Sequence, residues 1–149
     1  MDTWEVEARV EIAALVTAYN ALGDRGRFDE LLTLFADDAT MDIGDGSSYE
    51  GRVGIERIFT GTRDSLRDGS GPKFLQHHTT PVHVSFEDSD HASGDAYFTV
   101  ISDRGIDHWG RYRDAYLRVD GAWRIGSRRV RVDGLTPGGW ADQRLGADS

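Results

Sequence analysis

The sequence predicts an α+β fold in which helical patterns come first and strands follow. Apolar residues recur at helical spacing up to residue 66, whereas from residue 74 onward they alternate at every second position. A chain of 149 residues is the size of one domain. The Asp120-Gly121 dipeptide between two alternating runs is typical of an antiparallel hairpin. We therefore expect a cone-shaped, curved antiparallel sheet with three N-terminal helices packed on its concave face.

The N-terminal part contains three helical patterns. Residues 5–22 carry one apolar stripe, so we expect a helix there with Gly23 at its C-terminal end. A second helix is expected over 28–35 and a third over 51–66, with a short strand over 39–43 between them. The stripe of the first helix consists of Ile12, Leu15, Val16, Tyr19 and Leu22.

The second half of the chain is expected to form strands separated by turn residues. These strands should cover 74–86, 92–102, 108–119 and 122–132. After them, Pro137 and two following glycines indicate loop. We therefore expect a single domain over 1–149, with a core over about 5–133 and a loop tail over 134–149.

The composition excludes several classes of function. A net charge of −9 opposes nucleic-acid binding, which depends on neutralising phosphates. No run approaches the ~20 apolar residues that span a bilayer, and the acidic N-terminus lacks the apolar core of a secretory signal. The chain has no cysteine and therefore no disulfide framework. We expect a cytoplasmic protein that binds neither nucleic acid nor membrane.

The strand over 74–86 is where we expect the chemistry, because it begins with the His77-His78 pair. A histidine that lines a core can accept a proton near neutral pH if a carboxylate fixes its tautomer. Asp24, directly after the first helix, is the candidate carboxylate. The alternative for Asp24 is a loop or helix-capping role.

The two histidines compete for the inner face of this strand. Strict alternation from Val82 and Val84 places His78 inward. His77 faces inward only if a bulge near Thr80-Pro81 shifts the register by one residue, and proline favours a bulge because it has no N–H to donate.

Other residues could complete a pocket. Tyr19 lies on the inner stripe and could polarise a substrate carbonyl, or it could serve as a core aromatic. Arg128 could anchor an acidic substrate group or form an ion pair with Asp114. Three aromatic residues on the expected strands could line the cavity, with core packing as the alternative: Trp109, Tyr112 and Tyr97.

Several short motifs also occur in a fixed order along the chain. They are Tyr19 with Asp24 in YNALGD, the LFADDA run from Leu34, Tyr49-Glu50-Gly51, Gln76-His77-His78, GRYRD from Gly110, and DGAWR from Asp120 with Arg128 after it. With this order of elements, the chain resembles the SnoaL-like branch of the nuclear transport factor 2-like superfamily over about residues 5–133. That branch includes scytalone dehydratase, polyketide cyclases and bile-acid dehydratases.

The resemblance implies a function and a set of site residues. It implies a cofactor-free lyase of the dehydratase kind, or an isomerase or cyclase, that uses a His-Asp pair for general acid/base catalysis. The implied pair is Asp24 and His77, with His78 as the reserve and Tyr19 as the hydroxyl donor. The expected substrate is a small hydrophobic ring compound. No metal site is expected, because the five histidines show neither helical i, i+4 spacing nor an HxH pair.

Two alternatives remain. The same fold could be a non-catalytic module that binds a small molecule or drives oligomerisation. An epoxide hydrolase, which the superfamily also contains, would need a second pocket carboxylate to hold water. Because an exposed sheet face invites pairing, we expect a homodimer or homotrimer, with Trp4, Trp109 and Trp140 as candidate contacts.

Overall fold

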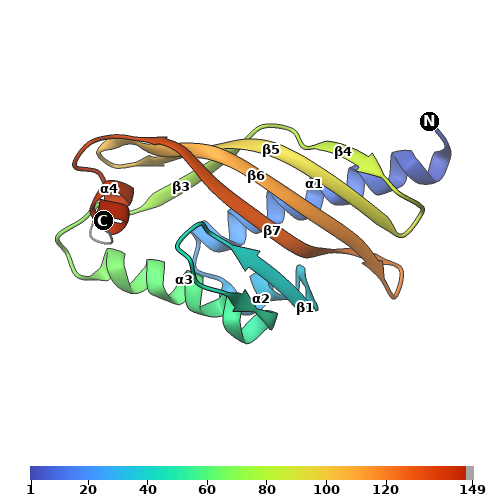
Figure 1. The fold of residues 1–149 in the computed structure, drawn as a ribbon, viewed down its shortest axis with the longest axis horizontal. Coiled ribbons are helices and arrows are strands. Elements are labelled where there is room, and N and C mark those ends of the chain that lie inside the picture. The colour runs from blue at the N-terminus through green and yellow to red at the C-terminus, as the bar shows by residue number, and fades with distance from the viewer. Residues whose placement is uncertain (147–149) are drawn as a thin grey trace.

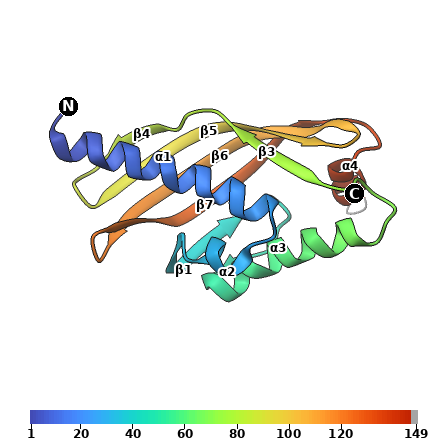
Figure 2. The same cartoon turned by 180° about the vertical axis from the view of Figure 1, so that it is seen from behind.

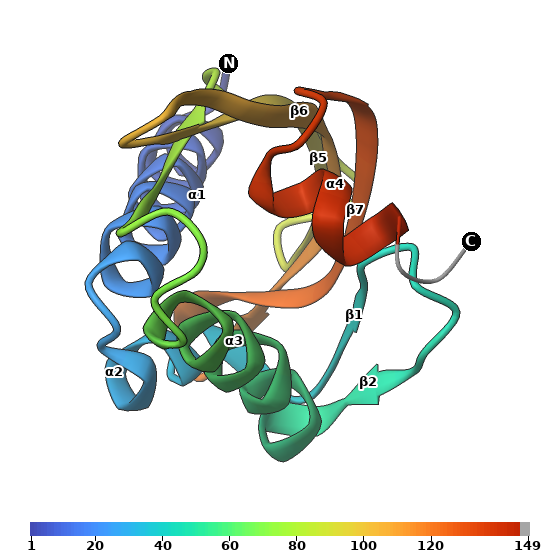
Figure 3. The ribbon, with the colours of Figure 1, turned by 90° about the vertical axis from the view of Figure 1, so that its left-hand side faces the viewer.

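A long helix lies against a curved sheet in the computed structural model, which describes residues 1–146 (Figure 1). Helix α1 (Thr3–Asp24) and the short α2 (Phe28–Leu32) lie on the inner side of the sheet together with α3 (Gly51–Arg67), and the sheet curls around them (Figure 3). Helix α4 (Trp140–Gly146) lies at the end of this hollow where α3 finishes. The described residues thus contain four helices, so the expected set of three N-terminal helices was incomplete.

Seven strands form one sheet in the order β2-β1-β7-β6-β5-β3, and β4 also pairs with β5. The α+β class and the curved sheet are confirmed. The expectation of a purely antiparallel sheet is wrong at one pair, because β1 and β7 run parallel. The strands are β1 (Phe35–Asp42), β2 (Tyr49–Glu50), β3 (Leu75–Thr79), β4 (His83–Phe86), β5 (His91–Ser102), β6 (Gly105–Val119) and β7 (Ala122–Leu135).

The end of α1 differs from the expectation by a few residues. Gly23 lies inside the helix, which continues to Asp24. The glycine that ends the helix is Gly26, with a φ of 71°, where the backbone N–H of Arg27 donates to the carbonyl of Leu22. Asp24 is therefore in the last turn of a helix rather than in a loop, and its side chain has a fixed direction.

The predicted strand over 74–86 is two strands that pair with the same neighbour. Thr79 pairs with Phe98, whereas His83 pairs with Asp95, so β3 and β4 together contain one more residue than β5 across this interval. The extra residue lies within 80–82, next to Pro81, which has no N–H for the ladder. As a result, odd-numbered residues of β3 and even-numbered residues of β4 share the inner face.

The C-terminal segment also differs from the expectation. Strand β7 continues to Leu135, and α4 occupies part of the tail that was expected to be loop. The backbone N–H of Thr136 donates to the carbonyl of Asp107, and this bond ties the segment to the start of β6. Residues 147–149 of the predicted tail lie outside the described residues.

The hydrophobic core has two parts. The larger part joins α1, α3 and the inner faces of several strands, and it includes the fully buried Ile12, Phe35 and Ile125. The smaller part consists of Leu75, Phe98, Val100 and Tyr112, nearer to α4. Within residues 1–146, no helix has the length and apolar character needed to cross a bilayer.

Candidate functional site

The hollow of the sheet holds a cavity of about 460 Å³ between the C-terminal half of α1, α3, α4 and the inner faces of β3, β5 and β6. This volume lies in the range of small-molecule sites, roughly 300–1,000 Å³. Apolar surface makes up most of the lining, and the polar residues that line it include several cationic side chains: Arg57, Arg63, Arg67, Lys73 and Arg144. The apolar lining includes Phe28, Phe59, Leu66, Leu75, Phe98 and Trp140.

Asp24, the last residue of α1, and His77, on β3, both line this cavity. Helix α1 and strand β3 lie side by side (Figure 2). His77 Nδ1 lies 2.7 Å from Asp24 Oδ1, and the backbone N–H of His77 donates to Asp24 Oδ2 at 2.9 Å. One carboxylate therefore holds both the backbone and the ring of the same histidine. Because a carboxylate accepts hydrogen bonds, the neutral imidazole donates from Nδ1 to Asp24 in this geometry, and its lone pair is on Nε2.

The register shift after β3 decides which of the two adjacent histidines reaches the cavity. His77 pairs with the buried Val100 and lines the cavity, whereas His78 pairs with Thr99 and has an exposed side chain. The inward position that simple alternation gave to His78 is therefore wrong.

Tyr19 and Tyr112 line the cavity and enclose the guanidinium of Arg128. The Arg128 Cζ atom lies 4.2 Å from the ring centroid of Tyr19 and 4.0 Å from that of Tyr112. Arg128 Nε and Nη2 donate to the two carboxylate oxygens of Asp114, each at 2.8 Å. Tyr116 also donates to Asp114 at 2.6 Å. Arg128 therefore forms the buried ion pair with Asp114, and it is not among the residues that line the cavity.

This arrangement keeps both tyrosines protonated. Burial raises the pKa of Tyr19, and the nearby charge of Arg128 offsets only part of the effect. Burial likewise raises the pKa of Tyr112, well above the usual range of a phenol. The two hydroxyl groups are thus proton-bearing donors at neutral pH, in a cavity whose other polar groups include the His77 acceptor.

Two predicted lining residues face the opposite side of the sheet. The side chain of Tyr97 is 65% exposed and that of Trp109 is 41% exposed, and neither lines the cavity. Side chains alternate along a strand, so Trp109, three positions before the inward Tyr112, must point outward. The same alternation separates Tyr97 from the inward Phe98.

With the fold and the cavity known, comparison with other proteins places the chain in a family. A family model described as a SnoaL-like domain matches residues 4–129. The chain belongs to this SnoaL-like family. The resemblance inferred from the sequence motifs is therefore confirmed at the level of the family.

Solved structures with the same fold as this SnoaL-like domain include two named for elimination reactions. A putative scytalone dehydratase from Novosphingobium aromaticivorans is 20% identical with a TM-score of 0.78, over 91% of each chain. Hexachlorocyclohexane dehydrochlorinase LinA-type3 from Novosphingobium barchaimii is 19% identical with a TM-score of 0.78, over 92% of this chain and 94% of that one. At these identities the similarity shows the fold alone.

A third solved structure is an NTF2-like protein with a cystatin-like fold from Novosphingobium aromaticivorans. It is 24% identical with a TM-score of 0.74, over 94% of this chain and 89% of that one. No curated protein matches the SnoaL-like chain in sequence at a significant level.

Two residues without a predicted place at the site also line the cavity of this SnoaL-like domain, His108 and Trp140, and the sequence had suggested Trp140 only as an oligomer contact. His108 is four positions before Tyr112 on β6, so strand alternation alone could have placed it inward. Trp140 begins a short helix directly after Pro137 and two glycines, and no periodic pattern preceded it to signal the helix. Within residues 1–146, no group of three or more His, Cys, Asp or Glu side chains is placed to hold a metal ion.

Proposed function

We propose that this SnoaL-like protein is a cofactor-free lyase or isomerase, of the dehydratase kind, acting on a small hydrophobic ring compound. The observation that carries the proposal is the 2.7 Å contact between Asp24 and His77 at the wall of a mostly apolar cavity. The names of two structural neighbours, a dehydratase and a dehydrochlorinase, support an elimination reaction. The cavity volume of about 460 Å³ supports a ligand of one or a few rings.

The reaction begins with removal of a proton from carbon. His77 Nε2 accepts a proton from the carbon next to a carbonyl group, and the electron pair of the C–H bond moves toward the carbonyl oxygen. The hydroxyl of Tyr19 or Tyr112 donates a hydrogen bond to that oxygen and stabilises the charge that develops there. Asp24 stabilises the imidazolium formed at His77.

The second step decides between elimination and isomerisation. In a dehydration, the electron pair returns to form a C=C bond, the C–O bond to the leaving hydroxyl breaks, and His77 gives its proton to that hydroxyl. Water and the unsaturated ketone are the products, and His77 is neutral again. In an isomerisation, His77 returns the proton to a different carbon. Both reactions need no redox partner, because no electrons are gained or lost overall.

The test is proton exchange at carbon. We would incubate the protein with 2-tetralone in D2O and measure deuterium uptake at the α-carbon by NMR, and then screen cyclic β-hydroxyketones for loss of water by mass spectrometry. The His77→Ala variant should lose ~10²-fold or more of the rate above buffer. The matched control is His78→Ala, because His78 is adjacent in sequence but exposed outside the cavity.

The outcomes separate the two functional classes. Equal exchange rates for wild type and His77→Ala would remove His77 as the base. Tight binding of the ring compounds with neither exchange nor loss of water would instead favour a module that binds a small molecule without catalysis.

A further inference from the structure

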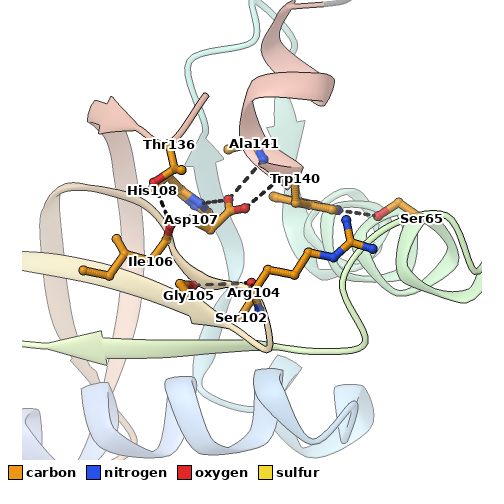
Figure 4. Close-up of polar contacts among 10 residues, drawn as sticks. All are labelled: Ser65, Ser102, Arg104, Gly105, Ile106, Asp107, His108, Thr136, Trp140 and Ala141. Carbon is orange, nitrogen blue, oxygen red and sulfur yellow. Dashed lines mark hydrogen bonds and ion pairs between the residues drawn. The ribbon is translucent and has the colours of Figure 1, made fainter. Parts of the chain in front are cut away.

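A second histidine–aspartate pair, Asp107 and His108, lies at the start of β6 (Figure 4), and His108 lines the same cavity. His108 Nδ1 lies 2.7 Å from Asp107 Oδ2. The backbone N–H of Trp140 donates to Asp107 Oδ1 at 2.6 Å, and that of Ala141 donates to Oδ2 at 3.1 Å. Both oxygens of Asp107 are thus acceptors for backbone donors. His108 Nδ1 is therefore the donor in the pair, and the free lone pair is at Nε2.

The ring of His108 is held in place between aromatic side chains. It stacks on Trp140 with centroids 5.9 Å apart and meets the edge of Phe98 at 5.8 Å, and all three residues line the cavity. Burial lowers the pKa of His108, so the ring is neutral at pH 7. Among the described residues, none hydrogen-bonds to His108 Nε2. This nitrogen is an acceptor without a protein donor among residues 1–146; it is not among the sealed, unpaired buried atoms, and on the cavity wall it can accept a hydrogen bond from a ligand.

The position of His108 relative to His77 follows from the strand register. His77 pairs with Val100 on β5, and Val100 pairs with His108 on β6, so the three residues form one row across the inner face. The histidines are two strands apart, and strands are spaced at 4.7–4.9 Å, which puts their Cα atoms roughly 10 Å apart. That separation matches the span of a small ring system.

We propose that the Asp107–His108 pair is a hydroxyl-binding subsite, in which His108 Nε2 accepts a hydrogen bond from a hydroxyl group on the ring of the ligand. The inference rests on the proposed function only in taking the same cavity as the ligand site. It narrows the substrate class from hydrophobic ring compounds to hydroxylated ones. The ring hydroxyl is bound at β6, away from the carbon that reacts at His77.

The test compares two probes that differ in one hydrogen-bond donor, 2-naphthol and 2-methoxynaphthalene. Calorimetric titration of wild type should give about five- to tenfold tighter binding of 2-naphthol, the size expected for one neutral hydrogen bond. His108→Phe should remove this preference. His78→Phe, the same change at an exposed histidine outside the cavity, should keep it. Equal affinity of wild type for both probes would overturn the proposal.

A second measurement needs no variant and so remains decisive if His108→Phe fails to fold. The imidazole Nε2 resonance of His108 in ¹⁵N-labelled wild type should lie at the position of an unprotonated nitrogen and move upfield when 2-naphthol binds. An unchanged resonance at saturation would contradict the subsite.

A third variant separates this inference from the proposed function. In His77→Ala, proton exchange should fall while the preference for 2-naphthol stays. Loss of the preference in His77→Ala, with retention in His108→Phe, would assign the hydroxyl acceptor to His77 and overturn the subsite. Normal exchange in His77→Ala with the preference intact would instead contradict the proposed function alone.

Discussion

The two histidine–aspartate pairs of the cavity have the same contact distance, 2.7 Å, but different surroundings. The side chains of His77 and Asp24 are 30% and 21% exposed, whereas those of His108 and Asp107 are 10% and 3% exposed. The second carboxylate oxygen of Asp24 accepts a hydrogen bond from the backbone N–H of His77. Asp107 instead accepts from two residues of α4. The same contact thus orients one ring in the first pair and joins two parts of the fold in the second.

A third pair shows that such a contact alone does not indicate a site. His91 Nδ1 lies 2.9 Å from Asp88 Oδ1, yet both side chains are more than half exposed and neither lines the cavity. All three pairs have the same kind of histidine–carboxylate contact. They differ in the residues that surround the imidazole. Variants of the three aspartates and histidines therefore test the comparison directly.

The largest expected effect comes from Asp24→Asn. An amide N–H facing His77 Nδ1 would favour the tautomer with the proton on Nε2, and that nitrogen could no longer act as a base. We expect α-proton exchange to fall at least ~10²-fold. The measurement is the deuterium uptake assay, with the ¹⁵N resonances of His77 as the readout of the tautomer. Full activity with Nε2 protonated would contradict the base assignment.

The next effect is on stability and concerns Asp107→Ala. The variant leaves the N–H groups of Trp140 and Ala141 and the ring of His108 without their acceptor in a buried place. We expect the free energy of unfolding to fall by about 2 kcal/mol, measured by urea denaturation. Asp88→Ala is the matched control, because the exposed pair with His91 should contribute much less to stability than the buried pair. If Asp107→Ala and Asp88→Ala had the same urea midpoint of unfolding, the buried pair would contribute no more to stability than the exposed pair.

The smallest effect is the pH dependence of stability. Burial lowers the pKa of His108 from its usual 6.5, so the unfolded chain takes up this proton first as the pH falls. Its contribution to stability is complete above about pH 6.5 and is lost as the pH falls below that value. His91 has the opposite sign, because its hydrogen bond to Asp88 raises its pKa. The contribution of His91 is complete below the usual pKa and is lost as the pH rises through the raised value.

Urea denaturation at a series of pH values from 5 to 8 checks both signs. His108→Gln should flatten the acid-side decline in the free energy of unfolding. His91→Gln should reduce the stability that is present on the acid side. An acid-side slope in His108→Gln equal to that of wild type would show that the buried imidazole is not the group that titrates.

Much of the fold could be predicted from the sequence, because hydrophobic periodicity is a local signal. The hairpin at Asp120-Gly121 was read correctly, and both residues have positive φ values, 51° and 81°. The parallel pairing of β1 with β7 could not be read, because it joins residues far apart in the chain. The C-terminal helix could not be predicted, because Pro137 and two glycines directly before it indicate a loop. Its first residue is also held by a hydrogen bond to Asp107, which is distant in sequence.

The site was predictable to the extent that strand alternation could be followed. Asp24 and His77 were named together, and the structure brings them into contact. Tyr97 and Trp109 were named because they are aromatic, although their position in the strand faces them outward. Alternation from Tyr112 places His108 on the inner face, but no motif in the sequence gives this histidine a role. Its role depends on Asp107 and Trp140, which only the folded chain brings together.

The one-residue offset between β3 and β4 means that chain length, as well as residue identity, selects the histidine in the hollow. An uninterrupted ladder that continued from β4 through the present sequence would pair His78, rather than His77, with Val100 and would turn His78 inward. Deletion of one residue within 80–82 would instead remove the offset and leave His77 paired with Val100. An alignment that places such a gap before residue 77, rather than within 80–82, would assign the role to the wrong histidine in a relative.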